Sequence, residues 1–290
     1  MKILITGNTS YAGRSLEKWL LQWPDKYLIE YISLRNEEWK DKDFSLYDVI
    51  FHVAAIVHQK EKPEMEELYY RVNRDLTIAL ANKAKNAGVK QFIFMSTLSV
   101  YGLVGTVGKE VMINKDTPCR PNSFYGKSKL EAEGLLERLQ NEDFKVAILR
   151  VPMIYGPNCP GNYEQLRKIT DKIPIFPSIN NNRSMIFIDN LSEFIRLLID
   201  NQDHGLFFPQ NQEYVNTSYL VTLIAKEKHK NMYLSKLLSL GINLLAVRIK
   251  VINKVFGNLT IDSNLSNYGD HKYCVVDLVE SVKRCEKIEK

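Results

Sequence analysis

The chain has 290 residues, of which 45% are apolar and 25% are charged. This length allows one large domain or two smaller ones with a buried core, and the composition excludes a disordered chain. The net charge of +5 comes from 39 basic and 34 acidic residues that are scattered along the sequence. It therefore indicates no nucleic-acid-binding surface.

Short apolar runs alternate with helical patterns through the first half of the chain. The alternation predicts an α/β fold with a doubly wound parallel Rossmann sheet. The first run leads into a glycine turn and a helical stretch, RSLEKWLLQW. The expected strands are Lys2–Thr6, Tyr27–Leu34, Asp48–Ala55, Gln91–Ser96 and Lys145–Val151, and the longer helices run from about Pro63 to Ala87 and from Tyr125 to Gln140.

The regular alternation fades after Val151, where Pro, Gly and Asn residues cluster between Pro152 and Asn182. We expect a dinucleotide-binding domain of residues 1–152 and 184–209, and a smaller α+β substrate-binding lobe of residues 153–183 and 210–290. The apolar stretch Leu237–Val247 is too short to span a bilayer. It predicts a buried helix, with membrane-surface contact as the alternative because Lys250 and Lys254 follow.

The turn after the first strand contains Gly7, Ser10 and Gly13. A glycine-rich turn that opens a helix directs backbone N–H groups toward a pyrophosphate, so the turn predicts dinucleotide binding. Any tight turn into a helix could show the same two glycines. Ser10 stands where a middle glycine would allow the closest approach, and its Cβ would weaken cofactor affinity.

The end of the second expected strand bears on the choice of cofactor. An acidic residue there would bind the ribose 2′-hydroxyl of NAD, but Ser33 and Arg35 occupy this region. A cation suits a 2′-phosphate, so NADP(H) is favoured over NAD(H), with Arg14 as a second candidate. In the alternative, Arg35 is a solvated surface residue and Glu37 or Glu38 serves as the acid.

Tyr125 and Lys129 stand four residues apart at the start of a predicted helix, and would share one face of it. A nearby ammonium should lower the pKa of the phenol and make it a usable proton donor or acceptor. Thr97, with Ser96 and Ser99 as neighbours, ends a strand at the carboxyl edge of the sheet and could bind the reacting oxygen. We therefore expect Thr97, Tyr125 and Lys129 to form the catalytic group, without a metal.

These segments resemble the extended short-chain dehydrogenases/reductases of the NAD-dependent epimerase/dehydratase family. The resemblance runs in family order through TGNTSYAG, DVIFHVAA, STLSVYG, YGKSK, RVPMIYGP and NRSMIFIDNL. The segments YGPNCPGN and INNNRSMIFIDNL are similar to bacterial capsule and O-antigen enzymes that reduce the 4-ketone of a UDP-linked 6-deoxy-N-acetylhexosamine. The segments LRNEEWKDKDF and VFGNL resemble the staphylococcal capsule type, which forms UDP-N-acetyl-D-fucosamine.

The resemblance implies a role for each matching position. Tyr125 would donate the proton, Lys129 would bind the nicotinamide ribose, and Thr97 would hold the sugar oxygen with Ser99 beside it. The remaining positions would bind the cofactor (backbone of Tyr11 and Ala12, then Ala54, Ala55 and Pro152) or the uridine diphosphate (Asn162 and Arg183). Close strand packing explains Ala54 and Ala55 equally well, and Arg183 could instead be a surface residue.

Two departures from the family pattern matter. The dehydratases carry an Asp-Glu pair after the active-site threonine, where this chain has Leu98 and Ser99, so we expect no dehydratase activity. The usual strand–helix insert between the second and third strands is nearly absent. Trp39 or Phe44 could then cover the adenine.

The expected activity is NADPH-dependent reduction of the 4-ketone of a UDP-2-acetamido-2,6-dideoxy-hexos-4-ulose, giving UDP-FucNAc or UDP-QuiNAc. The alternative is a NAD-dependent UDP-sugar 4-epimerase, and a non-catalytic cofactor-binding subunit is a third reading. A homodimer is expected through the helices at Pro63–Ala87 and Tyr125–Gln140. Four cysteines without paired spacing, and no apolar leader before the first strand, suggest the reducing cytoplasm.

Overall fold

The computed structural model describes residues 1–57, 61–246 and 248–287, and these form two compact units. Unit 1 consists of Met1–Gly102, Pro118–Val151 and Leu191–Pro209. Unit 2 consists of Leu103–Thr117, Pro152–Asn190 and the chain from Gln210 onward.

The units differ from the expected domains in two segments and at one further residue. The expected dinucleotide-binding domain includes residues 103–117, Pro152 and residues 184–190, but all of these belong to unit 2. Strand pairing explains this difference. β5 (Met112–Ile113) pairs with β12 (Thr260–Ile261), and β9 (Met185–Phe187) pairs with β7 (Met153–Tyr155). These partners lie far away in the sequence, so local patterns give no sign of them.

Unit 1 is built on one parallel sheet with strand order β10-β6-β4-β3-β1-β2, and the predicted α/β fold is confirmed. Strands β1, β3, β4 and β6 are buried along nearly their whole length, which explains their continuous apolar runs. The strands are β1 (Lys2–Thr6), β2 (Leu28–Ile32), β3 (Val49–His52), β4 (Gln91–Thr97), β6 (Lys145–Val151) and β10 (Gly205–Phe207).

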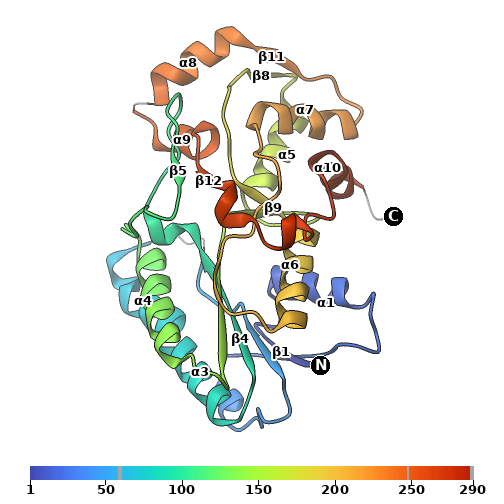
Figure 1. Ribbon diagram of the computed structural model, residues 1–290. Helices are drawn as coiled ribbons and strands as arrows, with labels where there is room; N and C mark the ends of the chain where they lie inside the picture. The colour runs from blue at the N-terminus through green and yellow to red at the C-terminus, as the bar shows by residue number, and fades with distance from the viewer. Residues whose placement is uncertain (58–60, 247, 288–290) are drawn as a thin grey trace. The chain divides into compact units, whose positions relative to one another are not determined.

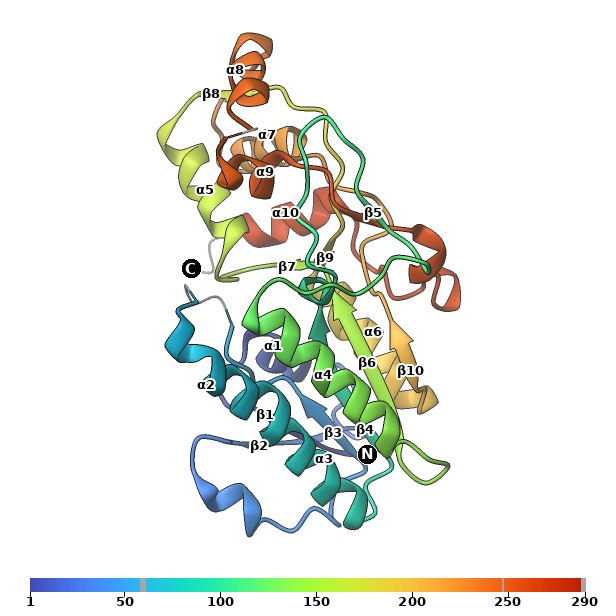
Figure 2. The same ribbon diagram turned by 90° about the vertical axis from the view of Figure 1, so that its left-hand side faces the viewer.

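Helices cover both faces of this sheet (Figures 1 and 2). On one face, α3 (Leu76–Asn86) and α4 (Phe124–Leu139) pack leucines and alanines against Leu4, Ile50, Phe92 and Ile148. On the other face lie α1 (Tyr11–Leu20) and α6 (Ile188–Asn201), which are joined by a hydrogen bond from Trp19 to Glu193 (2.9 Å). The sheet is therefore doubly wound.

The predicted long helix at Pro63–Ala87 consists of consecutive helical segments with a change of winding. η2 (Pro63–Met65) and α2 (Glu66–Tyr70) precede a π-helical turn, η3 (Arg71–Asp75), which continues into α3. Such π turns are rare and frequently mark functional positions. This turn carries the fully buried Asn73.

The connection from β2 to β3 contains one short 3₁₀ helix, η1 (Glu37–Lys40), in place of a full helix. Trp39 and Phe44 lie in this connection and are 4% and 1% exposed. Both belong to the core cluster that contains Leu80 and Ala84 of α3. The suggestion that they cover the adenine is therefore not supported, because both rings are packed inside this cluster.

Unit 2 contains short parallel strand pairs and several helices. β7 pairs with β9, β12 with β5, and β11 (Tyr233–Ser235) with β8 (Ile175–Pro177). Its α-helices are α5 (Asn162–Lys172), α7 (Thr217–Glu227), α8 (Lys236–Ala246), α9 (Lys250–Phe256) and α10 (Leu278–Glu286). Two short 3₁₀ helices, η5 (Ser263–Ser266) and η6 (Gly269–His271), precede α10. In unit 1, a further 3₁₀ helix, η4 (Leu98–Tyr101), follows β4. None of the helices in the described part of the chain is long and apolar enough to cross a membrane.

The stretch at Leu237–Val247 forms the expected helix, α8, as far as Ala246; Val247 lies outside the described residues. The prediction that this helix is buried is wrong. Leu237 is 77% exposed and Leu244 is 78% exposed. Apolar composition alone indicates that a segment avoids water, but it does not identify what covers the segment.

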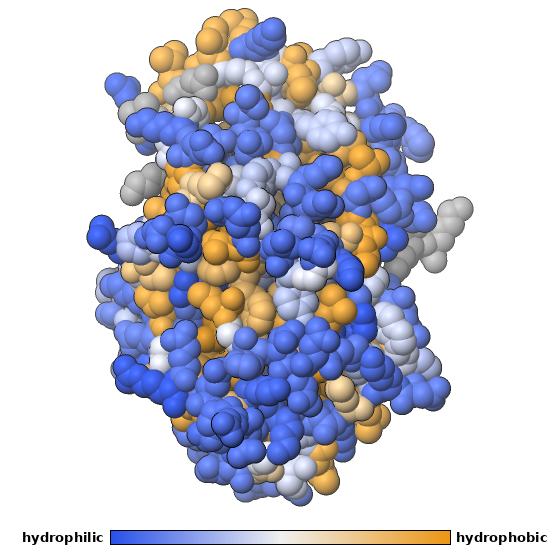
Figure 3. All heavy atoms as spheres, viewed as in Figure 1, coloured by the Kyte–Doolittle hydropathy of each residue, from blue (hydrophilic) through white to orange (hydrophobic). Residues whose placement is uncertain are grey.

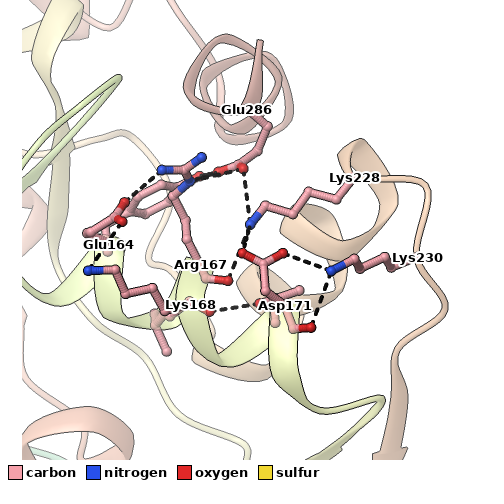
Figure 4. A network of polar contacts seen from close by, with 10 residues as sticks. Glu164, Arg167, Lys168, Asp171, Lys228, Lys230 and Glu286 are labelled. Carbon is pink, nitrogen blue, oxygen red and sulfur yellow. Dashed lines mark hydrogen bonds and ion pairs between the residues drawn. The ribbon is translucent and has the colours of Figure 1, made fainter. Parts of the chain in front are cut away.

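A buried carboxylate ties α5, α7 and α10 together (Figure 4). The Glu286 side chain is 2% exposed and accepts hydrogen bonds from Arg167 Nε (2.9 and 3.0 Å) and the Tyr163 hydroxyl (3.0 Å). Lys228 Nζ lies 3.7 Å from the same carboxylate and 2.9 Å from Asp171, which also binds Lys230. The negative charge of Glu286 thus compensates the positive charges of Arg167 on α5 and of Lys228 at the end of α7.

Replacing Glu286 with alanine should lower the stability of the chain by about 1–3 kcal/mol, because the buried Tyr163 hydroxyl and the partly buried Arg167 guanidinium each lose an acceptor. The measurement is urea unfolding followed by circular dichroism. Glu280→Ala removes a half-exposed partner of Arg284 from the same helix and serves as the control. Equal effects of the two substitutions would contradict a special role for the buried carboxylate.

Candidate active site

The turn between β1 and α1 is tight and leads directly into the helix. Gly7 has a φ of +86°, and a Cβ on it would lie 3.4 Å from the Cβ of Ala54. A Cβ on Gly13 would lie 2.9 Å from Ile5, so glycine allows α1 to pack directly on β1. Ser10 is the N-cap of α1 and accepts a hydrogen bond from Gly13 N (3.2 Å), which places Tyr11 and Ala12 in the first helical turn.

The loop after β3 is fixed next to this turn by two buried polar side chains. The Thr6 hydroxyl accepts a hydrogen bond from Ala54 N (3.2 Å). Asn73, on the π turn, accepts from Ile56 N (2.9 Å) and donates to Ile56 O (3.2 Å) and to the Ser128 hydroxyl of α4 (3.2 Å). Asn73 therefore connects the loop that contains Ala54 and Ala55 to the helix that carries Tyr125.

The N-terminus of α4 is capped by two side chains. Ser123 accepts a hydrogen bond from Gly126 N (3.0 Å), and Glu61 accepts from the backbone amides of Phe124 (2.8 Å) and Tyr125 (3.0 Å). A carboxylate at this end complements the helix dipole. A Cβ on Gly126 would lie 2.5 Å from the Ser99 carbonyl oxygen, so glycine here lets the helix approach the end of β4 closely.

Thr97 and Tyr125 meet at this contact. The Thr97 hydroxyl accepts a hydrogen bond from Ser99 N (3.1 Å) and lies 3.2 Å from the Ser99 hydroxyl. Burial raises the pKa of Tyr125 to about 12, although the hydrogen bond to Thr97 lowers it. The expected lowering of this pKa by Lys129 is therefore wrong for the chain without cofactor. At neutral pH the phenol keeps its proton.

Lys129 lies one turn further along α4 and is 1% exposed. Its Nζ donates a hydrogen bond to Met95 O (2.8 Å) and lies 4.3 Å from the centre of the Phe94 ring. Burial lowers the pKa of Lys129 to about 7, and the charge of Glu133 opposes this shift. The lysine can therefore change its charge near neutral pH.

The low pKa of Lys129 predicts how stability depends on pH. The unfolded lysine has a pKa of 10.5, so between pH 7 and pH 10.5 the unfolded chain binds more protons than the folded chain. The contribution of Lys129 to the free energy of unfolding therefore rises with pH between pH 7 and pH 10.5. Wild type should gain stability relative to Lys129→Met as pH increases from 7 to 10, measured by urea unfolding.

Lys127→Met is the control for this measurement, because it removes a lysine from the same helix at a partly exposed position. A constant difference between wild type and Lys129→Met across the window would contradict the lowered pKa.

Glu133 completes a stripe with Tyr125 and Lys129 at spacings of four residues. It is 2% exposed, accepts from the Ser96 hydroxyl, and pairs with Arg150 of β6 (Nη2, 2.7 Å; Nε, 3.1 Å). Arg150 in turn donates to the Tyr101 hydroxyl (2.8 Å). The pair lies where β4 and β6 place Ser96 opposite Arg150, and it fixes α4 over the carboxyl end of the sheet.

Unit 2 has a pocket of its own, and both predicted diphosphate-binding residues line it. Asn162 begins α5 and donates a hydrogen bond to the Met153 sulfur (3.4 Å). Arg183 Nη1 donates to Gly257 O (2.8 Å), and burial lowers the pKa of this arginine. Lys254 also lines the pocket. Two cations in one partly apolar pocket favour an anionic ligand.

The profile of the NAD dependent epimerase/dehydratase family matches residues 3–208. The chain belongs to this family. It is 33% identical to a UDP-glucose 4-epimerase of Vibrio cholerae over 248 residues, which cover 77% of this chain and 74% of that enzyme.

Two further proteins are similar at lower identity. The N-acetyl-alpha-D-glucosaminyl-diphospho-ditrans,octacis-undecaprenol 4-epimerase of Escherichia coli O157:H7 is 29% identical over 177 residues, which cover 59% of this chain and 51% of that enzyme. The crystal structure of a UDP-glucuronic acid 4-epimerase from Bacillus cereus in complex with NAD has a TM-score of 0.72 and 21% identity, and the match covers 99% of this chain and 96% of that one. The second match shows a shared fold.

In this member of the epimerase/dehydratase family, unit 1 contains Gly7, Ser10, Gly13, Ala54, Thr97, Tyr125 and Lys129, together with Tyr11, Ala12, Ala55, Arg35 and Ser99. Unit 2 contains Pro152, Asn162 and Arg183. Arg35 is exposed beyond the end of β2, where its backbone N–H donates to the Ser33 hydroxyl (3.3 Å).

Several supporting residues had no sequence prediction: Asn73, Glu61, Glu133, Arg150 and Lys254. Glu133 could have been found, because it follows Lys129 by four residues and is the first acidic position on that helical stripe. Glu61 and Arg150 act across long sequence separations, so no spacing rule identifies them.

Proposed function

We propose that this chain is a UDP-sugar 4-epimerase that works by reversible oxidation at C4. The observation that carries the proposal is the group formed by Thr97, Tyr125 and Lys129 at the end of β4. Its support is the similarity to the Vibrio cholerae UDP-glucose 4-epimerase over three-quarters of both chains. Unit 1 would bind a nicotinamide cofactor, and unit 2 would bind the nucleotide sugar.

The turn fits a dinucleotide in two respects: Gly7 has a φ of +86°, which residues with side chains rarely adopt, and a Cβ on Gly13 would lie 2.9 Å from Ile5. Gly7, Ser10, Tyr11, Ala12 and Gly13 would hold the pyrophosphate, with Ala54, Ala55 and Pro152 along the cofactor. When bound, the cofactor supplies hydride transfer at the sugar C4.

The chain's own residues would handle the proton and the developing charge. Tyr125 would exchange a proton with the oxygen on C4, and the Thr97 hydroxyl would hydrogen-bond the same oxygen. Lys129 would bind the nicotinamide ribose through Nζ and stabilise the phenolate form by its charge. Arg183 and Lys254 would bind the diphosphate, with Asn162 at the edge of the pocket.

The second candidate function is the NADPH-dependent 4-ketoreductase of capsule and O-antigen synthesis. Two observations favour it. Tyr125 keeps its proton at neutral pH, as a proton donor to a ketone must. Arg35 is exposed and pairs with no carboxylate among the residues that the structure describes, so it is available to a 2′-phosphate.

The test offers both reactions to the same preparation. The purified chain is incubated with NAD⁺ and UDP-glucose or UDP-N-acetylglucosamine, and C4 epimers are measured by chromatography. In parallel, NADPH or NADH is mixed with a UDP-2-acetamido-2,6-dideoxy-hexos-4-ulose, and the loss of reduced-nicotinamide absorbance is recorded. Epimer formation without net cofactor consumption supports the epimerase. Stoichiometric cofactor oxidation with the ketone and no epimer supports the ketoreductase.

Arg35→Ala should weaken NADPH binding by about tenfold and leave NADH binding unchanged, because a charge-assisted contact to the 2′-phosphate is worth about 1.5–3 kcal/mol before solvent exposure weakens it. The measurement is fluorescence titration with each cofactor. Lys40→Ala, on the same connection, is the control. The opposite result would be weaker NADH binding in Glu38→Gln and no change in NADPH or NADH affinity in Arg35→Ala. In that case Glu38 determines the cofactor specificity, and NAD(H) is preferred.

We also infer that the protein acts in the cytoplasm, because its nucleotide-sugar substrates would be used there. We further infer a homodimer that pairs through α3 and α4. Equilibrium sedimentation tests the homodimer. A monomer at micromolar concentration would contradict it.

A further inference from the structure

The outward face of α8 is made of leucines. Leu237, Leu240 and Leu244 are 77%, 61% and 78% exposed, and Leu238 and Leu245 flank them at 46% each. These positions share one side of the helix, since they repeat at spacings of three and four residues. Scattered exposed leucines are common on protein surfaces, but one helix face of five leucines indicates a binding surface.

The opposite face of α8 is fixed to unit 2, so the orientation of the helix is defined. Ser239 is 9% exposed, and its hydroxyl donates to Ser178 O (2.8 Å) and Ser235 O (3.0 Å). Ala246 is 7% exposed. The polar serine therefore faces the protein and the leucines face outward, which is the reverse of an ordinary surface helix.

The charged residues that lie near α8 in the sequence are all basic. The sequence contains no acidic residue between Glu227 and Asp262, whereas this interval contains Lys228, Lys230, Lys236, Arg248, Lys250 and Lys254. Asp171 neutralises Lys228 and Lys230. Lys236, at the start of α8, and Arg248, just beyond its end, pair with no carboxylate within the described ranges.

We propose that α8 docks on an anionic membrane surface, with its leucines inserted among the acyl chains and Lys236 and Arg248 at the lipid phosphates. An apolar helix face between basic residues is the pattern of helices that lie in the bilayer interface. Positive charge at both ends complements an anionic leaflet. A second copy of this chain would carry the same positive charges around the same face, which opposes pairing through α8.

Neighbouring residues extend the docking surface. Tyr233 and Leu234 of β11 precede α8 and are 64% and 42% exposed. Tyrosine is enriched at the level of lipid headgroups. Figures 1 and 2 both place α8 at an edge of unit 2, and Figure 3 shows hydrophobic residues gathered in that part of the view. The docking surface is therefore accessible to an extended planar partner.

The experiment is flotation of the full chain with vesicles of phosphatidylcholine alone or with an equal amount of phosphatidylglycerol. Wild type should float with the anionic vesicles and bind neutral vesicles at least tenfold more weakly. The double variant Leu240→Glu/Leu244→Glu should lose at least tenfold in binding to anionic vesicles. Lys236→Gln/Arg248→Gln should lose most of the preference for phosphatidylglycerol.

The control Leu21→Glu/Leu46→Glu changes two exposed leucines of unit 1, which are 67% and 58% exposed, and should float like wild type. Circular dichroism and cofactor titration check that each variant is folded. Absence of wild-type flotation overturns the proposal, as does unchanged flotation of the leucine variant. If wild type does not float and the leucine variant changes a dimer into a monomer in light scattering, α8 binds a second copy instead.

Discussion

Tyr125→Phe is expected to lower turnover by about 10²–10⁴-fold, the usual contribution of a positioned proton donor or acceptor. The substitution removes only the hydroxyl. The ring remains beside Thr97, and α4 keeps its caps at Ser123 and Glu61. The loss should therefore appear in the chemical step, with nearly unchanged cofactor affinity in fluorescence titration.

Tyr70→Phe is the matched control for this prediction, since it removes a hydroxyl from a partly exposed tyrosine on α2. It should retain wild-type turnover. Residual activity of Tyr125→Phe within a few-fold of wild type would remove Tyr125 from the mechanism. A parallel loss of cofactor affinity would instead point to a binding role.

Glu133→Ala is expected to destabilise unit 1 by about 3–5 kcal/mol, because removal of one partner leaves Arg150 as a buried, uncompensated charge. Arg150 is 9% exposed and lies between the carboxylate and the Tyr101 hydroxyl. Thermal and urea unfolding measure the loss. The same substitution removes the carboxylate charge that raises the pKa of Lys129, so any folded protein should also have a lower lysine pKa.

Glu131→Ala provides the comparison for Glu133, because Glu131 lies on the same helix and forms a half-exposed ion pair with Arg74 of η3. Its loss should cost less than about 1 kcal/mol. The double variant Glu133→Leu/Arg150→Met should recover much of the stability, since both charges are then absent. A cost below 1 kcal/mol for Glu133→Ala would show that the pair does not hold α4 in place.

The sheet and the proximity of Thr97 and Tyr125 could be predicted from the sequence because they depend on local patterns. Continuous apolar strands alternate with helices, and in a parallel sheet the carboxyl ends of the strands share one edge. Thr97 ends β4 and Tyr125 lies in the first turn of α4, so topology alone brings them close together.

The pKa of Tyr125 and the exposure of α8 could not be predicted, because each depends on what surrounds the residue in three dimensions. A lysine four positions away suggests a lowered phenol pKa, but burial of Tyr125 has the larger effect and Lys129 itself loses charge. The leucines of α8 indicate an apolar helix, but only Ser239 and Ala246 reveal which face points inward.

The most direct test of the proposed chemistry follows the hydrogen on C4. UDP-glucose and UDP-N-acetylglucosamine labelled with deuterium at C4 are incubated with the chain and NAD⁺, and the products are analysed by NMR. A C4 epimer that retains deuterium at C4 is the expected result, because reversible oxidation returns the same hydrogen to the same carbon. Absence of an epimer from both sugars, or an epimer that has exchanged its label with water, would contradict the account.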